Sequence, residues 1–505
     1  MVDALHEYSA LELHQLLQRR EVSPVEATAH YLERVGRLDA VVGAFAHVTA
    51  DAALERARAV ERDVPTAAPL WGMPLADKDL HPRAGVPTAF GSRAHAGEVP
   101  DASDDLVAAL DAAGAVSLGK TATPEYGLPS YTEPLAGRPA RNPWNLELGA
   151  GGSSGGAAAA VAAGLLPFAP GNDGGGSIRI PAASCGLVGV KPSRGRVPSG
   201  SGLDRLAGLG VVGPIARTVA DAALLLDGMI APHGYPPSHP FAVRAPGNDG
   251  PFLGAAIRGE GRFQVGVLRD TPWDTFTDIR LDPEARDALD AGIVLLDRLG
   301  HGVDEVPPAP EPDYPDAFRT IWQAGAATID VPAERRHLLE PLTRWLMARG
   351  RERSAGDLAA ALAWLVQFER RTIARFAPYD AVLTPALALT PRPVGWYDAE
   401  DGEENFAQQV RFTPYTSFVN VAGLPALVLP VHDTESGLPM AVQLIGRPGA
   451  SRRCSRSPRS SSARRGAAGG AHRPGEAAPA GRMARRTAVT LRVGSFRPSG
   501  AVCKT

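Results

Sequence analysis

The chain has 505 residues, of which 44% are hydrophobic and 21% charged, and its formal net charge is -3, a balance that excludes a disordered protein. No apolar run is long enough to predict a membrane span, and the three cysteines (Cys185, Cys454 and Cys503) have neither metal-ligand spacing nor the density of a disulfide framework. The N-terminus lacks the pattern of a secretory signal, so we expect a cytoplasmic protein.

The charge is unevenly distributed along the chain. Residues 451–505 contain 12 Arg, one Lys and a single acid, Glu476, whereas the first 450 residues carry a net charge of -15. An acidic body of that size does not favour nucleic-acid binding, so we expect no nucleic-acid partner for it.

Residues 1–65 are predicted to form helices that pack on the core. Two pairs, Ser9 with Glu12 and Ser23 with Glu26, have the spacing of capping boxes. Apolar side chains then recur at helical spacing: Leu13, Leu16 and Leu17, followed by Ala27, Tyr31 and Val35. One face of each helix is therefore expected to be buried.

From Trp71 to Pro198, short apolar runs alternate with small-residue helices, as in an α/β protein. The runs GMPLADKDL and AGAVSLGKT are typical of strands, and residues 155–173 predict a helix and then a strand that leads into a glycine loop. The region 235–380 has long helical patterns, one of which opens with a capping pair, Ser354 and Asp357. The runs YDAVLTPAL and AGLPALVLPV then predict buried strands.

Two glycine-rich loops, GGSSGG at 151–156 and GGGSIR at 174–179, are open to three interpretations. A phosphate site is disfavoured because the GK[ST] of a P-loop is missing. The first loop also matches the GxSxG nucleophile elbow, but no spacing selects His301 or His432 as its base. Simple tight turns are the third interpretation. Each loop taken alone is best interpreted as a simple turn. The two loops taken together with Lys78 are not.

The segment 151–198, from GGSSGG to KPSRGRVP, is similar to the signature segment of the amidase signature enzymes. These include bacterial amidases, fatty acid amide hydrolase and the A-type subunit of glutamyl-tRNA amidotransferase. The likeness covers about residues 5–449 and includes GMPLADKDL, NPWN, GPIARTVADAALLLDGM and GLPMAVQLIGRPG. It implies a single α/β/α domain around a large mixed β-sheet, with a catalytic region at 66–450 whose substrate side is the variable segment 235–380.

The same resemblance implies hydrolysis of a small-molecule amide without metal or cofactor, by a protein that is not membrane-bound and that could form a homodimer. Its catalytic set would be a Ser-Ser-Lys triad with Lys78 as base, Ser153 as the bridging serine and Ser177 as nucleophile. A lysine removes a proton only when neutral, so burial must lower its pKa from about 10.4. The neighbouring Asp77 and Asp79 would point to the opposite face of the strand, which keeps their stabilisation of the ammonium form small.

Further roles follow from the resemblance. The peptide bond between Gly152 and Ser153 is expected to be cis, and Asp173 with Arg179 would form a structural pair that holds the second loop. Backbone N–H groups of that loop would stabilise the oxyanion. The residues concerned are Gly174, Gly175, Gly176 and Ser177 for the oxyanion hole, Tyr126 and Ser130 for the substrate pocket, and Trp322, Trp345, Trp364 and Phe368 as side chains that either line the pocket or simply pack between helices.

The chain departs from the family pattern in both loops. Asn172 stands where Ser or Thr commonly precedes the aspartate, and Gly149 and Ala150 stand where Thr and Pro are common. Ala122 replaces a common Asn. No triad member is lost, so these departures bear on loop rigidity and substrate preference rather than on the reaction.

The basic segment 451–505 also departs from the family, which would continue after Gly449 with an amphipathic helix resembling EATLLRLAAQLE. If the start of this segment is back-translated with GC-rich codons and then read one base early, from the last base of the Ala450 codon, it reads EPPLLALAAQLE. We therefore expect that residues 451–505 come from a shifted frame and form a disordered tail, with an RNA-binding arm as the alternative. Two rivals to a working amide hydrolase follow: an A-type subunit of glutamyl-tRNA amidotransferase, which needs partner subunits, and a catalytically impaired remnant.

Overall fold

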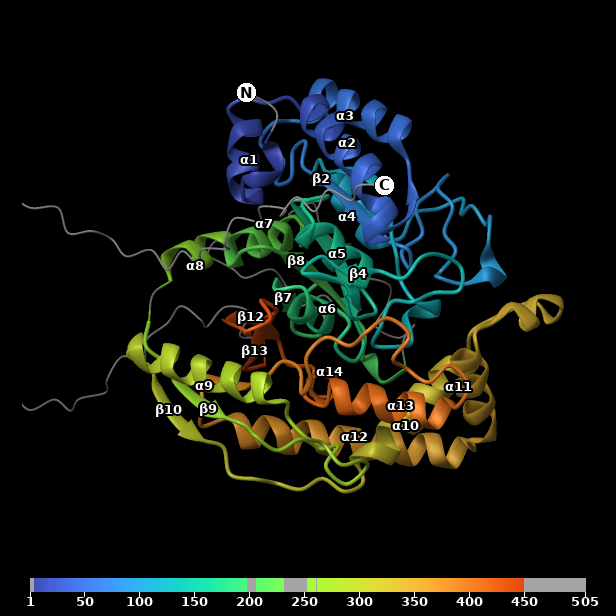
Figure 1. Cartoon of the computed structure of the whole chain (residues 1–505), viewed down its shortest axis with the longest axis vertical. Helices are drawn as coiled ribbons and strands as arrows, with labels where there is room; N and C mark the ends of the chain where they lie inside the picture. Colours follow the sequence, from blue (N-terminus) through green and yellow to red (C-terminus); the bar gives the residue numbers. More distant parts are fainter. Residues whose placement is uncertain (1–3, 198–205, 231–251, 260, 449–505) are drawn as a thin grey trace, which may run out of the picture. The chain divides into compact units, whose positions relative to one another are not determined.

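The computed structural model describes residues 4–197, 206–230, 252–259 and 261–448 (Figure 1). The predicted tail and the first part of the predicted variable region, up to residue 251, lie outside these residues. The helices are α1 (Ala10–Gln18), α2 (Pro24–Val42), α3 (Ala50–Asp63), α4 (Asp105–Ala112), α5 (Gly155–Ala162), α6 (Arg179–Ser184), α7 (Val219–Met229), α8 (Phe252–Arg258), α9 (Pro283–Arg298), α10 (Tyr314–Ala327), α11 (Pro341–Glu352), α12 (Ala355–Phe376), α13 (Gly402–Phe412) and α14 (Ser417–Val421). The strands are β1 (Phe45–Val48), β2 (Pro74–Lys78), β3 (Val116–Thr121), β4 (Arg141–Asn142), β5 (Asn145–Gly149), β6 (Phe168–Asp173), β7 (Val188–Lys191), β8 (Val211–Ala216), β9 (Gln264–Val267), β10 (Gly302–Glu305), β11 (Ala381–Pro385), β12 (Ala426–Asp433) and β13 (Pro439–Gly446).

The N-terminal helices start where the sequence predicts. Both capping boxes are present, with the Ser9 side chain accepting from the Glu12 N–H before α1 and Ser23 doing the same for Glu26 before α2. The backbone N–H of Leu11 donates to Asp221 of α7 at 2.8 Å, which ties α1 to the central part of the fold. The buried faces of α1 and α2 belong to the same hydrophobic cluster as β6 and α5.

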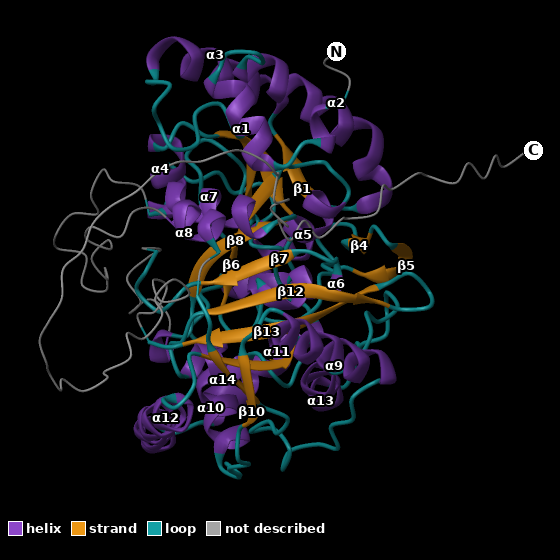
Figure 2. Cartoon of the chain, turned by 90° about the vertical axis from the view of Figure 1, so that its left-hand side faces the viewer, coloured by secondary structure: helices purple, strands orange, loops and turns teal. Residues whose placement is uncertain are grey.

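The central sheet has eight strands in the order β10-β9-β11-β13-β12-β7-β8-β6 (Figure 2). Strand β9 is parallel to β10 and β11, and the other neighbours are antiparallel. The predicted mixed α/β architecture is therefore confirmed.

Helices cover both faces of the middle of this sheet. Successive residues of a strand point to opposite faces, and in β13 Ala441 and Val442 belong to different hydrophobic clusters. Ala441 shares its cluster with Ala182 of α6, whereas Val442 shares its cluster with Leu289 of α9. The sheet thus lies between two helical layers, as in an α/β/α domain.

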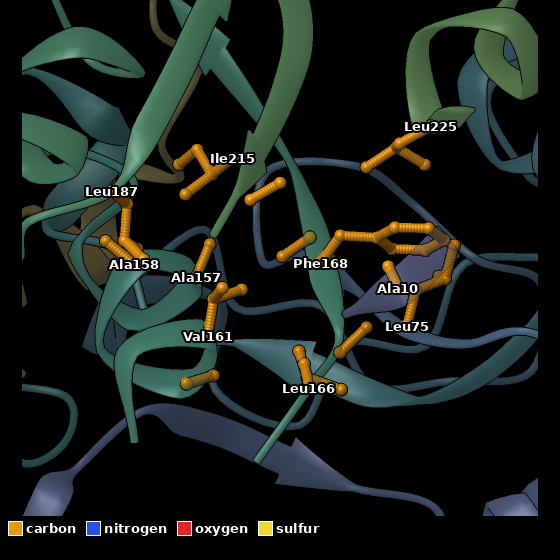
Figure 3. Packing of buried hydrophobic residues seen from close by; sticks show 14 of the residues in the cluster. Ala10, Leu75, Ala157, Ala158, Val161, Leu166, Phe168, Leu187, Ile215 and Leu225 are labelled. Atoms are coloured by element: carbon orange, nitrogen blue, oxygen red, sulfur yellow. The ribbon is translucent and has the colours of Figure 1, made fainter. Parts of the chain in front are cut away.

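A second sheet has the strand order β1-β3-β2, and its β2 lies against β6, the edge strand of the large sheet. Leu75 of β2, Phe168 of β6 and the alanines of α5 pack in one cluster (Figure 3). All five residues of β2 are buried. Lys78, the last of them, is therefore held in the interior.

The helices α10 to α13 lie close together in Figure 1 and enclose a second hydrophobic cluster with strand residues. Helix α12 begins with the predicted capping box of Ser354 and Asp357 and buries Leu365 and Phe368. Across the ranges given above, no helix combines the length and the apolar character needed to cross a bilayer.

Candidate active site

Lys78 is completely buried, and its side-chain nitrogen lies within hydrogen-bond distance of three side chains. Nζ is 2.8 Å from Ser153 Oγ and 3.0 Å from Ser154 Oγ, and it also donates to Asn172 Oδ1. The end of β2, the first glycine loop and the end of β6 therefore meet at this nitrogen. A buried lysine is unusual unless such polar partners surround it.

The two acids beside Lys78 are engaged elsewhere, as the strand alternation predicts. Asp77 accepts from Arg83 Nε at 2.6 Å and from Ser117 Oγ at 2.8 Å. Asp79 accepts from two backbone N–H groups of the 89–91 turn. Burial raises the pKa of Asp79 to about 6, although the positive charge of Lys120 acts in the opposite direction.

Two features connect the first glycine loop to the second. The peptide bond between Gly152 and Ser153 is cis, as expected from the resemblance. The backbone N–H of Ser154 donates to the carbonyl oxygen of Ser177 at 3.1 Å. This hydrogen bond holds Ser154, and with it the neighbouring Ser153, beside the loop that carries Ser177.

The loop between β6 and α6 is held by a buried ion pair. Asp173 and Arg179 are both fully buried and form two bonds of 2.9 Å, from Nε and from Nη2. Burial alone would raise the pKa of Asp173, but the charge and hydrogen bonds of Arg179 lower it to about 2. Asn420 and Gln443 accept from the remaining guanidinium N–H groups. The curvature of the loop therefore depends on residues far away in the chain.

The backbone N–H groups of this loop are not equivalent. That of Gly176 donates to Asp173 Oδ1 at 2.7 Å. Those of Gly174, Gly175 and Ser177 donate to no group among the described residues. Three of the four expected oxyanion donors are therefore available to an external acceptor, whereas Gly176 serves the ion pair.

Ser177 borders a cavity of about 60 Å³. The aromatic side chains of its wall are those of Trp273, Phe318, Trp322 and Phe406. Within the described part of the chain, no charged side chain lines this cavity. A Cβ added to Gly174 would lie 3.6 Å from the ring of Trp322, so this ring faces the glycine turn directly.

The predicted pocket residues divide into two groups. Ser130 and Trp322 border the cavity, and the N–H of Ser130 donates to Gln409 of its wall at 2.8 Å. Tyr126 does not border it and packs edge-on against His95, with 5.7 Å between ring centroids. The others also lie outside the wall and pack within the helical region: Trp345, Trp364 and Phe368.

Several residues that sequence reasoning did not select also build this site. Ser154 and Asn172 complete the surroundings of Lys78 Nζ, and Thr416 donates to the carbonyl oxygen of Gly175 at 2.6 Å. The sequence contains a hint for two of them, because Ser154 stands in GGSSGG and Asn172 is a departure from the family pattern. It contains none for Thr416, whose position depends on how α14 packs against the loop.

Comparisons with known proteins find relatives that cover most of the chain. A family model described as Amidase matches residues 26–454. A putative amidase of Synechocystis sp. is 37% identical over 452 residues, which cover 88% of this chain and 85% of the relative. The A-type subunit of glutamyl-tRNA(Gln) amidotransferase from Nitratidesulfovibrio vulgaris is 34% identical, with 88% of this chain and 94% of the relative covered. The solved structure of 6-aminohexanoate cyclic dimer hydrolase superposes with a TM-score of 0.78 at 28% identity, over 88% of this chain and 94% of that one.

Proposed function

The chain belongs to the amidase signature family and is a hydrolase of amide bonds, and we propose that it works through a Ser-Ser-Lys triad and a covalent acyl-enzyme on Ser177. The observation that carries this proposal is the buried contact of 2.8 Å between Lys78 Nζ and Ser153 Oγ, next to a loop that presents Ser177 to a cavity.

In the first half of the reaction, neutral Lys78 accepts the proton of Ser153, and Ser153 accepts the proton of Ser177. Ser177 Oγ then attacks the amide carbon. When the tetrahedral intermediate collapses, the carbon–nitrogen bond breaks and the Ser153 hydroxyl gives its proton to the departing nitrogen, while Lys78 returns its own proton to Ser153. The amine or ammonia leaves, and the acyl group stays on Ser177.

In the second half, water takes the place of the amine. It attacks the acyl carbon and passes a proton to the Ser153–Lys78 pair, which returns it to Ser177 as the carboxylic acid departs. The negative oxygen of both tetrahedral intermediates would accept from the N–H groups of Gly174, Gly175 and Ser177. Side chains on these glycines would occupy the space that the oxygen needs.

The cavity wall favours an uncharged substrate. Its lining combines aromatic and aliphatic side chains with neutral polar groups such as Ser130 and Gln409. A charged acyl group would lose its hydration there without gaining an ion-pair partner. We therefore propose small aryl or short alkyl amides as substrates, with the acyl group beside Trp322 and Phe318.

A glutamyl-tRNA amidotransferase component is the main alternative, because relatives of that kind cover most of this chain. Its substrate glutamine carries an ammonium and a carboxylate group, for which the described wall offers no charged partner. This argues for a hydrolase of uncharged amides. A catalytically impaired remnant is the second alternative. The cytoplasmic location and the homodimer stay predictions from the sequence.

The test is a panel of benzamides, short aliphatic amides and glutamine, assayed with wild type and with Ser177→Ala. We expect hydrolysis of the uncharged amides, no release of ammonia from glutamine, and loss of activity in the variant. Hydrolysis that survives in Ser177→Ala would overturn the proposed mechanism. A folded wild type that hydrolyses nothing and leaves Ser177 unreactive towards a fluorophosphonate probe would favour the remnant.

A further inference from the structure

The side chain of Asn172 is the least explained group around Lys78. It lies at the end of β6 with only 4% of its surface exposed. Its Oδ1 accepts from Lys78 Nζ, and its Nδ2 has no hydrogen-bond partner among the described residues. This orientation is the favourable one because the opposite one would place an N–H₂ donor against an ammonium group. A carboxamide oxygen accepts hydrogen bonds and never donates them.

Ser154 has an equally fixed role. Its hydroxyl donates to the backbone carbonyl of Asn172 at 3.3 Å, so its proton is already used. Towards Lys78 Nζ, at 3.0 Å, Ser154 Oγ therefore acts as an acceptor. Two of the three side chains at this nitrogen, Ser154 and Asn172, thus accept from the lysine.

These constraints decide where the lone pair of a neutral lysine points. A charged Lys78 has three N–H bonds, and all three neighbours can accept from it. A neutral Lys78 has two, which go to Ser154 and Asn172 because neither of these can donate to it. The lone pair of the amine then faces Ser153 Oγ at 2.8 Å. Both protonation states fit the same positions of the heavy atoms.

We propose that Asn172 is a positioning residue that directs the lone pair of Lys78 at Ser153 and so sets the direction of proton transfer in the triad. The inference rests on the proposed function. In the step that it controls, the O–H bond of Ser153 breaks, the electron pair of Lys78 Nζ forms the new N–H bond, and Ser153 takes the proton of Ser177. A hydroxyl at position 172, as Ser or Thr would supply, can donate to the lone pair and compete with Ser153.

Charged groups on the neighbouring elements are engaged with one another. Asp173 of β6 pairs with Arg179 of α6, and burial together with the charge of Arg179 lowers the pKa of Lys191 on β7. On β2 and directly after it, the carboxylates of Asp77 and Asp79 face a separate group that contains Arg83 and the Lys120 of β3. None of these groups is altered by a substitution at position 172, so a change in the titration of Lys78 reports on Asn172.

The experiment measures how fast a fluorophosphonate probe labels Ser177 between pH 5 and pH 10, so it needs no knowledge of the substrate. In the labelling step, Ser177 Oγ attacks phosphorus, fluoride leaves, and the proton of Ser177 passes through Ser153 to Lys78. The rate requires neutral Lys78 and therefore rises with pH through the pKa of Lys78.

Two substitutions at position 172 should move this midpoint in opposite directions. Asn172→Leu removes an acceptor of the ammonium form, so we expect a midpoint at lower pH and a rate roughly 10²-fold lower at the plateau, because a lysine N–H then turns to Ser153. Asn172→Asp adds a negative charge, so we expect a midpoint roughly 1 to 3 pH units higher.

The matched control is Asn142→Leu. Asn142 is also a buried asparagine, and it bonds to the backbone carbonyl of Ser184, away from Lys78. We expect this control to keep the wild-type midpoint. If Asn172→Leu does not fold, Asn172→Ala removes the same acceptor without added bulk and has the same expected result.

A folded Leu or Ala variant with the wild-type midpoint would overturn the inference, whatever the Asp variant does, while leaving the proposed function intact. A wild type whose Ser177 is never labelled would overturn the proposed function and the inference with it.

Discussion

Lys78 is the residue on which the proposed chemistry depends most. We predict that Lys78→Met lowers the rate of fluorophosphonate labelling by roughly 10³-fold, within the range that a general base contributes. Methionine fills a similar volume, so the loss should be chemical and not structural.

The chain offers a second buried lysine as the control. Lys120 lies on β3 and donates to the carbonyl of His81, outside the site. Lys120→Met should leave the labelling rate of each folded molecule unchanged. Equal losses in the two variants would mean that Lys78 has no special role.

The buried pair of Asp173 and Arg179 should make stability depend on pH. Because the folded pKa of Asp173 is about 2 and an unfolded aspartate titrates near 3.9, the ionised carboxylate stabilises the fold above about pH 4. This contribution is lost as the pH falls from about 4 towards 2.

We therefore expect Asp173→Asn to reduce the free energy of unfolding by roughly 3 to 5 kcal/mol at pH 7 and by less at pH 3, as measured by urea titration. The exposed pair of Arg19 and Glu21 is the reference, since both side chains are more than half exposed. Glu21→Ala should cost less than about 1 kcal/mol. A difference between wild type and Asp173→Asn that grows on acidification would contradict this account.

At this scale the sequence was most informative about Lys78, Ser153 and Ser177, because their motifs are long and spaced in a recognisable way. It could not reveal that Arg179 also contacts Asn420 and Gln443, since those bonds connect positions 241 and 264 residues apart in the chain. Such contacts depend on tertiary packing and leave no local pattern.

The loop between β6 and α6 contains glycines with two different functions. Gly176 has a φ of +135°, and a Cβ there would lie 2.4 Å from Thr416 Oγ1. At Gly175 the nearest atom to an added Cβ is 3.8 Å away, on Phe318 across the cavity. Gly176 is therefore required by its backbone conformation and close packing, whereas Gly175 keeps space open in the cavity.

We predict that Gly176→Ala lowers both stability and activity, and that Gly175→Ala lowers activity alone. A methyl group at position 175 would occupy the approach to the available N–H groups, so we expect a loss of roughly 10² in kcat/KM with an unchanged melting temperature. Equal melting temperatures for the two variants would contradict the assignment of Gly176.

A second contribution to the pH dependence of stability comes from Glu340, directly before helix α11. Burial, with the nearby charge of Glu125, raises the pKa of Glu340 to about 7, and the carboxylate accepts from the N–H of Leu135 at 2.7 Å. A carboxyl group whose folded pKa is raised binds its proton more tightly in the folded state, so stability falls as the pH rises from about 4.5 through 7.

Glu340→Gln keeps an acceptor for Leu135 and removes the charge. We expect the variant to gain stability relative to wild type at pH 8 and to show no gain at pH 4.5, in urea titrations at both values. A constant difference between the two proteins would show that Glu340 does not titrate in this range.

Helix starts were predictable because capping is local. Ser23 and Glu26, or Ser354 and Asp357, are three residues apart and settle the first turn among themselves. The role of Trp364 was not predictable in the same way. The helical spacing indicates which residues share a face, but the contact of Trp364 with Tyr314 of α10, with 6.4 Å between ring centroids, depends on how the two helices pack.

At the scale of the molecule, the order of strands in the large sheet could not be derived from the sequence alone. The β12 and β13 hairpin is local, yet β6 pairs with β8 and β11 lies between β9 and β13. Such neighbours are chosen by the packing of the whole chain. Strand and helix propensities could not predict this order, whereas the resemblance to a family implied the architecture.

The contacts described for the site join residues of the catalytic region. The partners given above for Lys78 Nζ, Asp173 and the guanidinium of Arg179 all lie between positions 153 and 443. We therefore predict that a chain ending at residue 450 labels with fluorophosphonate as fast as the full chain.

Slower labelling of the shortened chain would mean that residues 451–505 support the site. The proposed frame shift has its own test, because sequencing the gene across codon 450 distinguishes an intact frame from a shifted one.

The contacts of Lys78 and Arg179 also have a consequence for synthesis. Lys78 finds Ser153 after 75 further residues, and the loop of Ser177 gains its support from Gln443 only when β13 has been made. Closing such long loops is slow relative to forming local helices. On the ribosome, Lys78 and Ser153 are both made before Ser177, but the loop of Ser177 is not fixed until Gln443 has emerged. A growing chain therefore has no competent nucleophile until almost all of the described fold has been made.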